Sequence, residues 1–147
     1  MHNPMDIPTP IVDEPIFTIY TKSNCPNCVE YKKLLEYDNL ATCTVDCDSY
    51  LNENRPAFKD FMITMICNSP RITIPYLDQT DVKVLTVQDK LNAYSKKYDR
   101  NYLMKSLSFP IVFYNGSYIS SPLSFLQDFN DYMKELNVDD YDERDTF

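Results

Sequence analysis

The chain has 147 residues, enough for one domain with a sizeable core, and it contains 22 acidic and 14 basic side chains, five cysteines and one glycine. Its net charge of −8 argues against a protein that coats nucleic acid or binds an anionic membrane surface, because both tasks need a basic face. The only histidine, His2, excludes a Cys–His or Ser–His dyad and a histidine-ligated metal centre inside the fold, and the single glycine excludes a glycine-rich phosphate-binding loop.

The two ends of the chain differ in composition from the segment between them. Residues 1–15 are dense in proline, which predicts an extended arm without ladder hydrogen bonds. Residues 138–147 are rich in aspartate and predict a solvated acidic tail. No secretory signal and no apolar run of about 18 residues occurs, so we expect a soluble protein of the cytoplasm.

Strand and helix signals alternate between these ends. In chain order they predict a strand at Ile16–Tyr20, a helix from Pro26 through CVEYKKLLEYD, a strand at Ala41–Asp46, a helix at Arg55–Cys67, a strand at Ile72–Leu77, a helix at Val87–Met104, strands at Ile111–Tyr114 and Ser117–Ile119, and a last helix at Leu123–Leu136. Asn115-Gly116 between two strands is a strong hairpin signal. A parallel β-α-β unit followed by an antiparallel hairpin predicts an α/β fold, with a mixed four-stranded sheet flanked by helices.

A pair of cysteines lies where the first expected strand meets the first expected helix. Ser23 and Asn24 are residue types that cap helix N-termini, and Pro26 suits a first helical turn. Cys25 would then face unpaired backbone N–H groups and the positive end of the helix dipole, which favour its reactive thiolate. Cys28, one turn further on, can attack a mixed disulfide formed by Cys25. We therefore predict Cys25 as the catalytic nucleophile and Cys28 as the resolving thiol.

Two other interpretations of these cysteines remain open. The pair could be half of a zinc or iron–sulfur site, with Cys43 and Cys47 as the other half. It could also consist of two unrelated buried thiols, since free cysteine behaves as a small apolar residue. The strand–CPxC–helix context favours redox chemistry over both. We expect Cys43, Cys47 and Cys67 to be structural, because nothing near them in the sequence would activate a thiol.

Several segments together resemble a glutaredoxin. They are IYTKSNCPNC (19–28) with the helix that follows it, TVDCD (44–48), SFPIVFYNGSYI (108–119) and the final helix, and they cover most of residues 16–136. The resemblance implies a thioredoxin-like fold, with a glutaredoxin-like domain over residues 16–137. It also implies a dithiol–disulfide oxidoreductase that reduces protein disulfides or glutathione mixed disulfides through the CPNC dithiol.

The resemblance also assigns residues to a glutathione site. In the family, a lysine three residues before the first cysteine helps to bind the glutathione carboxylate, and Lys22 matches it. The residue before a cis-proline exchanges main-chain hydrogen bonds with the cysteine of glutathione. Asn27 replaces the aromatic residue common inside the family's CPxC motif, and Ser120-Ser121 stands where the family has Gly-Gly. The expected glutathione-binding residues are Lys22, Asn27, Phe109, Pro110, Ser120 and Ser121.

Two X-Pro bonds could supply the cis-proline, Ile74-Pro75 and Phe109-Pro110. Ile74-Pro75 lies at the usual distance from Cys25 for a small glutaredoxin, and Thr73-Ile74-Pro75 is similar to the family's Thr-Val-Pro. Phe109-Pro110 alone is followed by an Asn-Gly hairpin and a helix. We favour it because turn chemistry is more diagnostic than loop length. Residues 68–107 are then largely an insertion before the cis-proline strand.

The resemblance implies glutathione and disulfide-containing proteins as partners. We expect no bound metal or organic prosthetic group, with glutathione as the co-substrate that restores the dithiol. Nucleic acid and membranes are not expected as partners. The alternative function is a redox-inert thioredoxin-fold module, in which the insertion and the acidic tail dock a protein partner.

Overall fold

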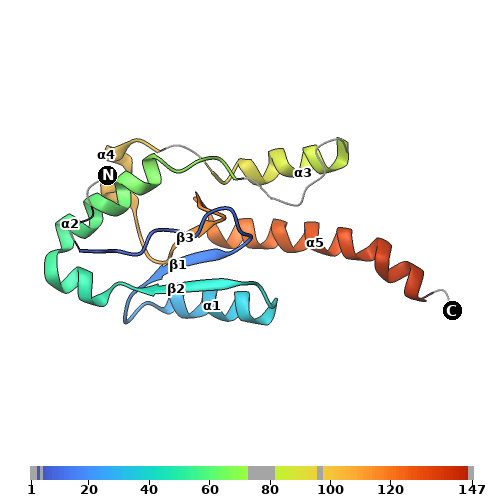
Figure 1. Cartoon of the computed structure of the whole chain (residues 1–147), viewed down its shortest axis with the longest axis horizontal. Helices are drawn as coiled ribbons and strands as arrows, with labels where there is room; N and C mark the ends of the chain where they lie inside the picture. Colours follow the sequence, from blue (N-terminus) through green and yellow to red (C-terminus); the bar gives the residue numbers. More distant parts are fainter. Residues whose placement is uncertain (1–2, 4, 73–81, 96–97, 146–147) are drawn as a thin grey trace.

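Four strands form one mixed sheet at the centre of the computed structural model, which describes residues 3, 5–72, 82–95 and 98–145 (Figure 1). The strands are β1 (Phe17–Thr21), β2 (Thr42–Asp46), β3 (Ile111–Tyr114) and β4 (Ser117–Tyr118), in the spatial order β2-β1-β3-β4. Strand β1 runs parallel to β2 and antiparallel to β3, and β3 forms a hairpin with β4. The predicted α/β class, with a mixed four-stranded sheet flanked by helices, is confirmed.

Five helices flank the sheet in the described part of the chain: α1 (Pro26–Tyr37), α2 (Asp48–Cys67), α3 (Val82–Asn92), α4 (Arg100–Ser106) and α5 (Pro122–Asp145). Successive residues of a strand point to opposite faces, which divides the core into two clusters. Phe17 and Ile19 of β1 pack with side chains of α1 and α5, whereas Tyr20 packs with side chains of α2. Helices α2 and α4 lie side by side, and α5 extends well beyond the sheet (Figure 1).

Aromatic side chains fill the centre of the cluster under α5. The ring of Phe17 lies 4.8 Å from that of Tyr114, 6.0 Å from that of Phe125 and 5.8 Å from that of Phe129, measured between centroids. All four residues are buried. Aromatic pairs at these separations add to the free energy gained by burial alone, so this cluster fixes α5, and with it Pro122, against the sheet.

Helix α2 begins earlier than predicted. The sequence indicated a helix from Arg55, but α2 begins at Asp48 and is interrupted at Asn54, which has φ −161° and ψ 90°. The side-chain oxygen of Asn54 accepts a hydrogen bond of 3.1 Å from the backbone N–H of Ala57, as an N-cap residue does. Pro56 suits the first turn of the segment that follows. The predicted start at Arg55 is therefore the start of the second segment of α2.

The helix predicted at Val87–Met104 is two helices. Helix α3 ends at Asn92 and α4 begins at Arg100, after Asp99 caps it by accepting a hydrogen bond of 2.9 Å from the backbone N–H of Tyr102. The strand predicted at Ile72–Leu77 falls, except for the buried Ile72, outside the described residues. The last helix is longer than predicted, because α5 continues past Leu136 to Asp145.

The proline-rich arm packs on the sheet. Ile7 is buried, and the hydroxyl group of Tyr20 donates a hydrogen bond of 2.5 Å to the carbonyl of Pro8. The backbone N–H of Ile11 donates to the hydroxyl group of Thr18 at 3.1 Å. Within the residues described, no helix combines the length and apolar character that crossing a membrane requires.

Candidate functional site

Cys25 and Cys28 form a disulfide at the point where the chain passes from β1 into α1. Their Cα atoms are 5.3 Å apart, an ordinary separation for a disulfide. Cys25 is the N-cap of α1 and keeps 9% of its surface exposed, against 2% for Cys28. Cys25 is therefore the more exposed residue of the pair. This close pair is compatible with redox activity.

The start of α1 is arranged to stabilise negative charge on the sulfur of Cys25. The backbone N–H of Cys28 donates a hydrogen bond of 3.2 Å to that sulfur. The first turn of α1 contains no acidic residue, so no side chain of that turn offsets the positive end of the helix dipole. Once the disulfide is reduced, these features favour the thiolate of Cys25 over its thiol, and the thiolate is the nucleophilic form.

The segment before β3 brings four of the predicted site residues together. The Phe109-Pro110 peptide bond is cis, as predicted, whereas the alternative Pro75 lies outside the described residues. The Nζ atom of Lys22 lies over the ring of Phe109, 5.6 Å from its centroid, which is close enough for a cation–π interaction. Asn27, Phe109 and Pro110 line one cavity of about 230 Å³. Phe109 thus lies beside Lys22 on one side and shares a cavity with Asn27 and Pro110.

Ser120 and Ser121 lie at the connection from β4 to α5. Ser120 lines a smaller cavity of about 110 Å³ together with Pro110. Its backbone N–H and its hydroxyl group both donate to the carbonyl of Tyr94, each at 2.8 Å. The exposed Ser121 caps the beginning of α5, where its carbonyl accepts from the N–H of Phe125. Both donors of Ser120 are therefore already used within the protein.

Asp48 supports the loop before Cys25, and sequence reasoning missed this role. Its carboxylate accepts a hydrogen bond of 2.9 Å from the backbone N–H of Ser23 and another from the hydroxyl group of Ser23. These bonds, together with the charge of Lys22, hold the pKa of Asp48 below its usual value of 3.8. Asp48 belongs to the TVDCD segment, but only the fold places it beside Ser23.

Replacing Asp48 with asparagine is expected to destabilise the protein at neutral pH. Because the pKa of Asp48 is lower in the folded chain than in the unfolded one, its charged form contributes stability above about pH 5, and the contribution is lost as the pH falls through the folded value. The measurement is the urea midpoint of the variant and of the wild type at each pH. The midpoint of the variant should be lower at pH 7, and the difference between the two proteins should be smaller at pH 3. Ser23→Ala should reproduce part of the effect and be non-additive with Asp48→Asn.

A second cavity, of about 380 Å³, lies on the other side of Phe109 and carries three cationic side chains. Its cationic lining residues are Lys22, Arg55 and Lys59, and its apolar lining residues include Phe58 and Phe109. Arg55 and Lys59 were also missed by sequence reasoning. Their spacing of four residues on a predicted helix places them on one face. Nothing in the sequence indicates that this face meets Lys22.

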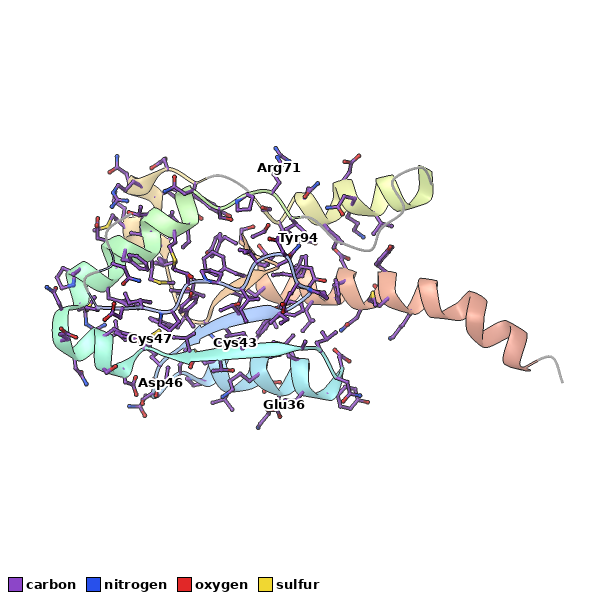
Figure 2. All side chains as sticks on the ribbon, in the orientation of Figure 1. Glu36, Cys43, Asp46, Cys47, Arg71 and Tyr94 are labelled. Atoms are coloured by element: carbon purple, nitrogen blue, oxygen red, sulfur yellow. A yellow bond between two sulfur atoms is a disulfide. The ribbon has the colours of Figure 1, made fainter. Side chains whose placement is uncertain are left out.

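The other three cysteines, Cys43, Cys47 and Cys67, are not part of a disulfide. Cys43 lies on β2 and Cys47 follows its last residue by one position (Figure 2). The sulfur of Cys67 lies 3.4 Å from the carbonyl oxygen of Tyr98. In the described part of the chain, no group of three or more histidine, cysteine or acidic side chains is close enough to hold a metal ion.

Cys47 is expected to resist alkylation in the folded, reduced protein. It is fully buried, and burial with the nearby charge of Asp46 raises the pKa of its thiol to about 12. At pH 8 the thiol therefore stays protonated, and the thiolate that iodoacetamide needs is scarce. Treatment with iodoacetamide followed by peptide mass spectrometry should label Cys25 quickly and Cys47 only when urea is added. Equal labelling of both thiols without urea would contradict this assignment.

Comparisons with models of protein families, with curated proteins and with solved structures found no match for this chain.

Proposed function

We propose that the protein is a glutaredoxin-type thiol–disulfide oxidoreductase, which reduces protein disulfides or glutathione mixed disulfides through Cys25 and Cys28. The observation that carries this proposal is the cysteine pair itself: a disulfide at the N-terminus of α1, in which the first cysteine is the more exposed residue. The cis Phe109-Pro110 segment shares a cavity with Asn27 of the same motif, which supports a substrate-binding role beside the sulfurs.

The reaction begins from the reduced dithiol. The thiolate of Cys25 attacks one sulfur of a substrate disulfide, so that bond breaks, a bond between Cys25 and that sulfur forms, and the second substrate sulfur leaves as a thiolate. Cys28 then loses its proton and attacks the sulfur of Cys25, which releases the first substrate sulfur. The net change moves two electrons from the dithiol to the substrate and leaves the Cys25–Cys28 disulfide.

Glutathione is the proposed co-substrate that restores the dithiol, in a reducing compartment such as the cytoplasm. Two glutathione molecules supply two electrons and leave as glutathione disulfide. Lys22 and Arg55 offer cations for a carboxylate, and Phe109 lines the same cavity. The wider proposed binding set is Lys22, Asn27, Phe109, Pro110, Ser120 and Ser121. No metal or organic prosthetic group takes part in these steps.

The proposal is tested by measuring reduction of bis(2-hydroxyethyl) disulfide and of insulin disulfides, with glutathione or with a thioredoxin–thioredoxin reductase system as the electron source. Turnover with either source supports the oxidoreductase. If neither source gives turnover, while the Cys25–Cys28 pair is demonstrably reduced, the redox-inert binding module becomes the better interpretation.

A further inference from the structure

Three cavities meet at the Ser108–Pro110 segment. The first is the cationic cavity of about 380 Å³, which lies on the α2 side. The second, of about 230 Å³, lies between α1 and the start of α5, and the third, of about 110 Å³, lies against α4. Ser108 lines all three. The cavities therefore lie on both sides of the cis-proline segment, and Lys22 and Asn27, which are close in sequence to the disulfide, line the first and the second.

The first two cavities differ in chemistry. Lys22, Arg55 and Lys59 give the α2 side a local positive charge, although the chain as a whole carries a net charge of −8. Such a site is complementary to an acidic side chain. The cavity on the α5 side is lined mostly by apolar and aromatic residues, Tyr31, Phe109, Pro110, Pro122 and Leu123, with three polar residues, Asn27, Glu30 and Ser108. Leu123 is 62% exposed there, which suits contact with an apolar side chain of a partner.

The insertion closes the end of the site near Ser120. Both donors of Ser120 point to the carbonyl of Tyr94, which lies in the connection between α3 and α4. The hydroxyl group of Tyr94 in turn donates to Asp128 of α5, whose carboxylate also pairs with Lys90 at 3.2 Å. Figure 2 shows Tyr94 between α3 and α5. The segment between α3 and α4 would therefore have to move before Ser120 could donate a hydrogen bond to a ligand.

We propose that the preferred disulfide substrate is a cysteine in an extended polypeptide, with an acidic residue on its α2 side and an apolar residue on its α5 side, rather than glutathione. This inference rests on the proposed function and specifies its substrate. A polypeptide has side chains on both sides of its cysteine, so it can occupy the cavity on the α2 side and the cavity on the α5 side at the same time. The tripeptide loses the contact with Ser120, because Tyr94 takes both donors.

The test compares disulfides that share one leaving group. Cysteine peptides flanked by aspartate and leucine, by lysine and leucine, or by aspartate and serine are each joined to 2-mercaptoethanol, as is glutathione. Both sequence orders are made, because the cavities fix the two sides of the cysteine in space and not the direction of the peptide. Reduction by Cys25 and Cys28 releases the peptide thiol and 2-mercaptoethanol and leaves the Cys25–Cys28 disulfide.

In the better order, we expect kcat/KM for the aspartate–leucine peptide to exceed that for each of the other three substrates about tenfold. Arg55→Glu should bring the ratio between the aspartate–leucine and lysine–leucine peptides to one or below. Leu123→Ser should equalise the aspartate–leucine and aspartate–serine peptides. Because each readout is a ratio within one variant, a general loss of activity cancels. The control Lys134→Glu lies about 18 Å along α5 from Pro122 and should leave both ratios unchanged.

Two outcomes separate the inference from the function on which it rests. In the first outcome every substrate is reduced, but the glutathione disulfide reacts as fast as the aspartate–leucine peptide, or the lysine–leucine peptide does. The protein is then an oxidoreductase, and the proposed preference for such a polypeptide is wrong. If no substrate is reduced, including bis(2-hydroxyethyl) disulfide, the proposed function itself fails.

Discussion

Cys25→Ser is expected to lower disulfide reduction by about a thousandfold or more, which corresponds to roughly 4 kcal/mol of lost transition-state stabilisation. A serine hydroxyl at the start of α1 stays protonated at neutral pH and does not attack sulfur as a thiolate does. The hydrogen bond from the N–H of Cys28 and the helix dipole then have no reactive anion to stabilise. The assay is the reduction of bis(2-hydroxyethyl) disulfide with glutathione as the electron source.

Cys28→Ser should behave differently, because it removes only the resolving step. The thiolate of Cys25 still attacks, so a mixed disulfide with a peptide substrate should accumulate and be visible in the intact mass. Cys43→Ser, on β2, is the matched control and should keep wild-type turnover, since Cys43 lies outside the pair. Turnover retained by Cys25→Ser would show that another group is the nucleophile.

Phe17→Ala is expected to cost about 3–5 kcal/mol of unfolding free energy. The side chain is 1% exposed and packs its ring against Tyr114, Phe125 and Phe129. Truncation removes these contacts and leaves a cavity between β1 and α5. Urea denaturation should show a lower midpoint with little change in slope.

Two further variants keep the stability prediction testable if Phe17→Ala fails to fold. Phe17→Leu keeps most of the apolar volume and should show a smaller loss in the same direction. Tyr37→Ala truncates an aromatic side chain that is 86% exposed at the end of α1, and it should change the free energy of unfolding by no more than about 0.5 kcal/mol. Equal losses for Phe17→Ala and Tyr37→Ala would contradict the importance of the aromatic cluster.

Much of the fold was predictable, because its signals are local. Short runs rich in apolar and β-branched residues predicted the strands of the sheet, Asn115-Gly116 identified the hairpin, and Pro26 identified the start of α1. The early start of α2 was missed, because the segment from Asp48 to Asn54 is largely polar and gives little helical periodicity. The break between α3 and α4 was also missed, although Asp99 is a capping residue type.

The site was predictable only where its residues are close in sequence or match a motif. The Cys25–Cys28 pair and the Phe109-Pro110 bond follow from such patterns. The contacts of Asp48 with Ser23 and of Tyr94 with Ser120 join residues about 25 positions apart, and no local rule indicates which partner each chooses. Hydrogen bonds of this kind depend on the packed chain as a whole.

The single glycine shows where the folding unit begins. Gly116 has φ +81° in the hairpin turn, and a Cβ atom there would lie 2.5 Å from Cγ1 of Val12 in the arm. A shortened chain that began at Ile16 would lose the contact of Val12 with Gly116 and the buried side chain of Ile7. It would also lose the carbonyl of Pro8, which accepts the hydrogen bond from Tyr20. The prolines give the arm the composition of a linker, but we expect it to unfold in one cooperative transition with the sheet. The shortest version of this protein that is stable by itself should therefore begin at about residue 5.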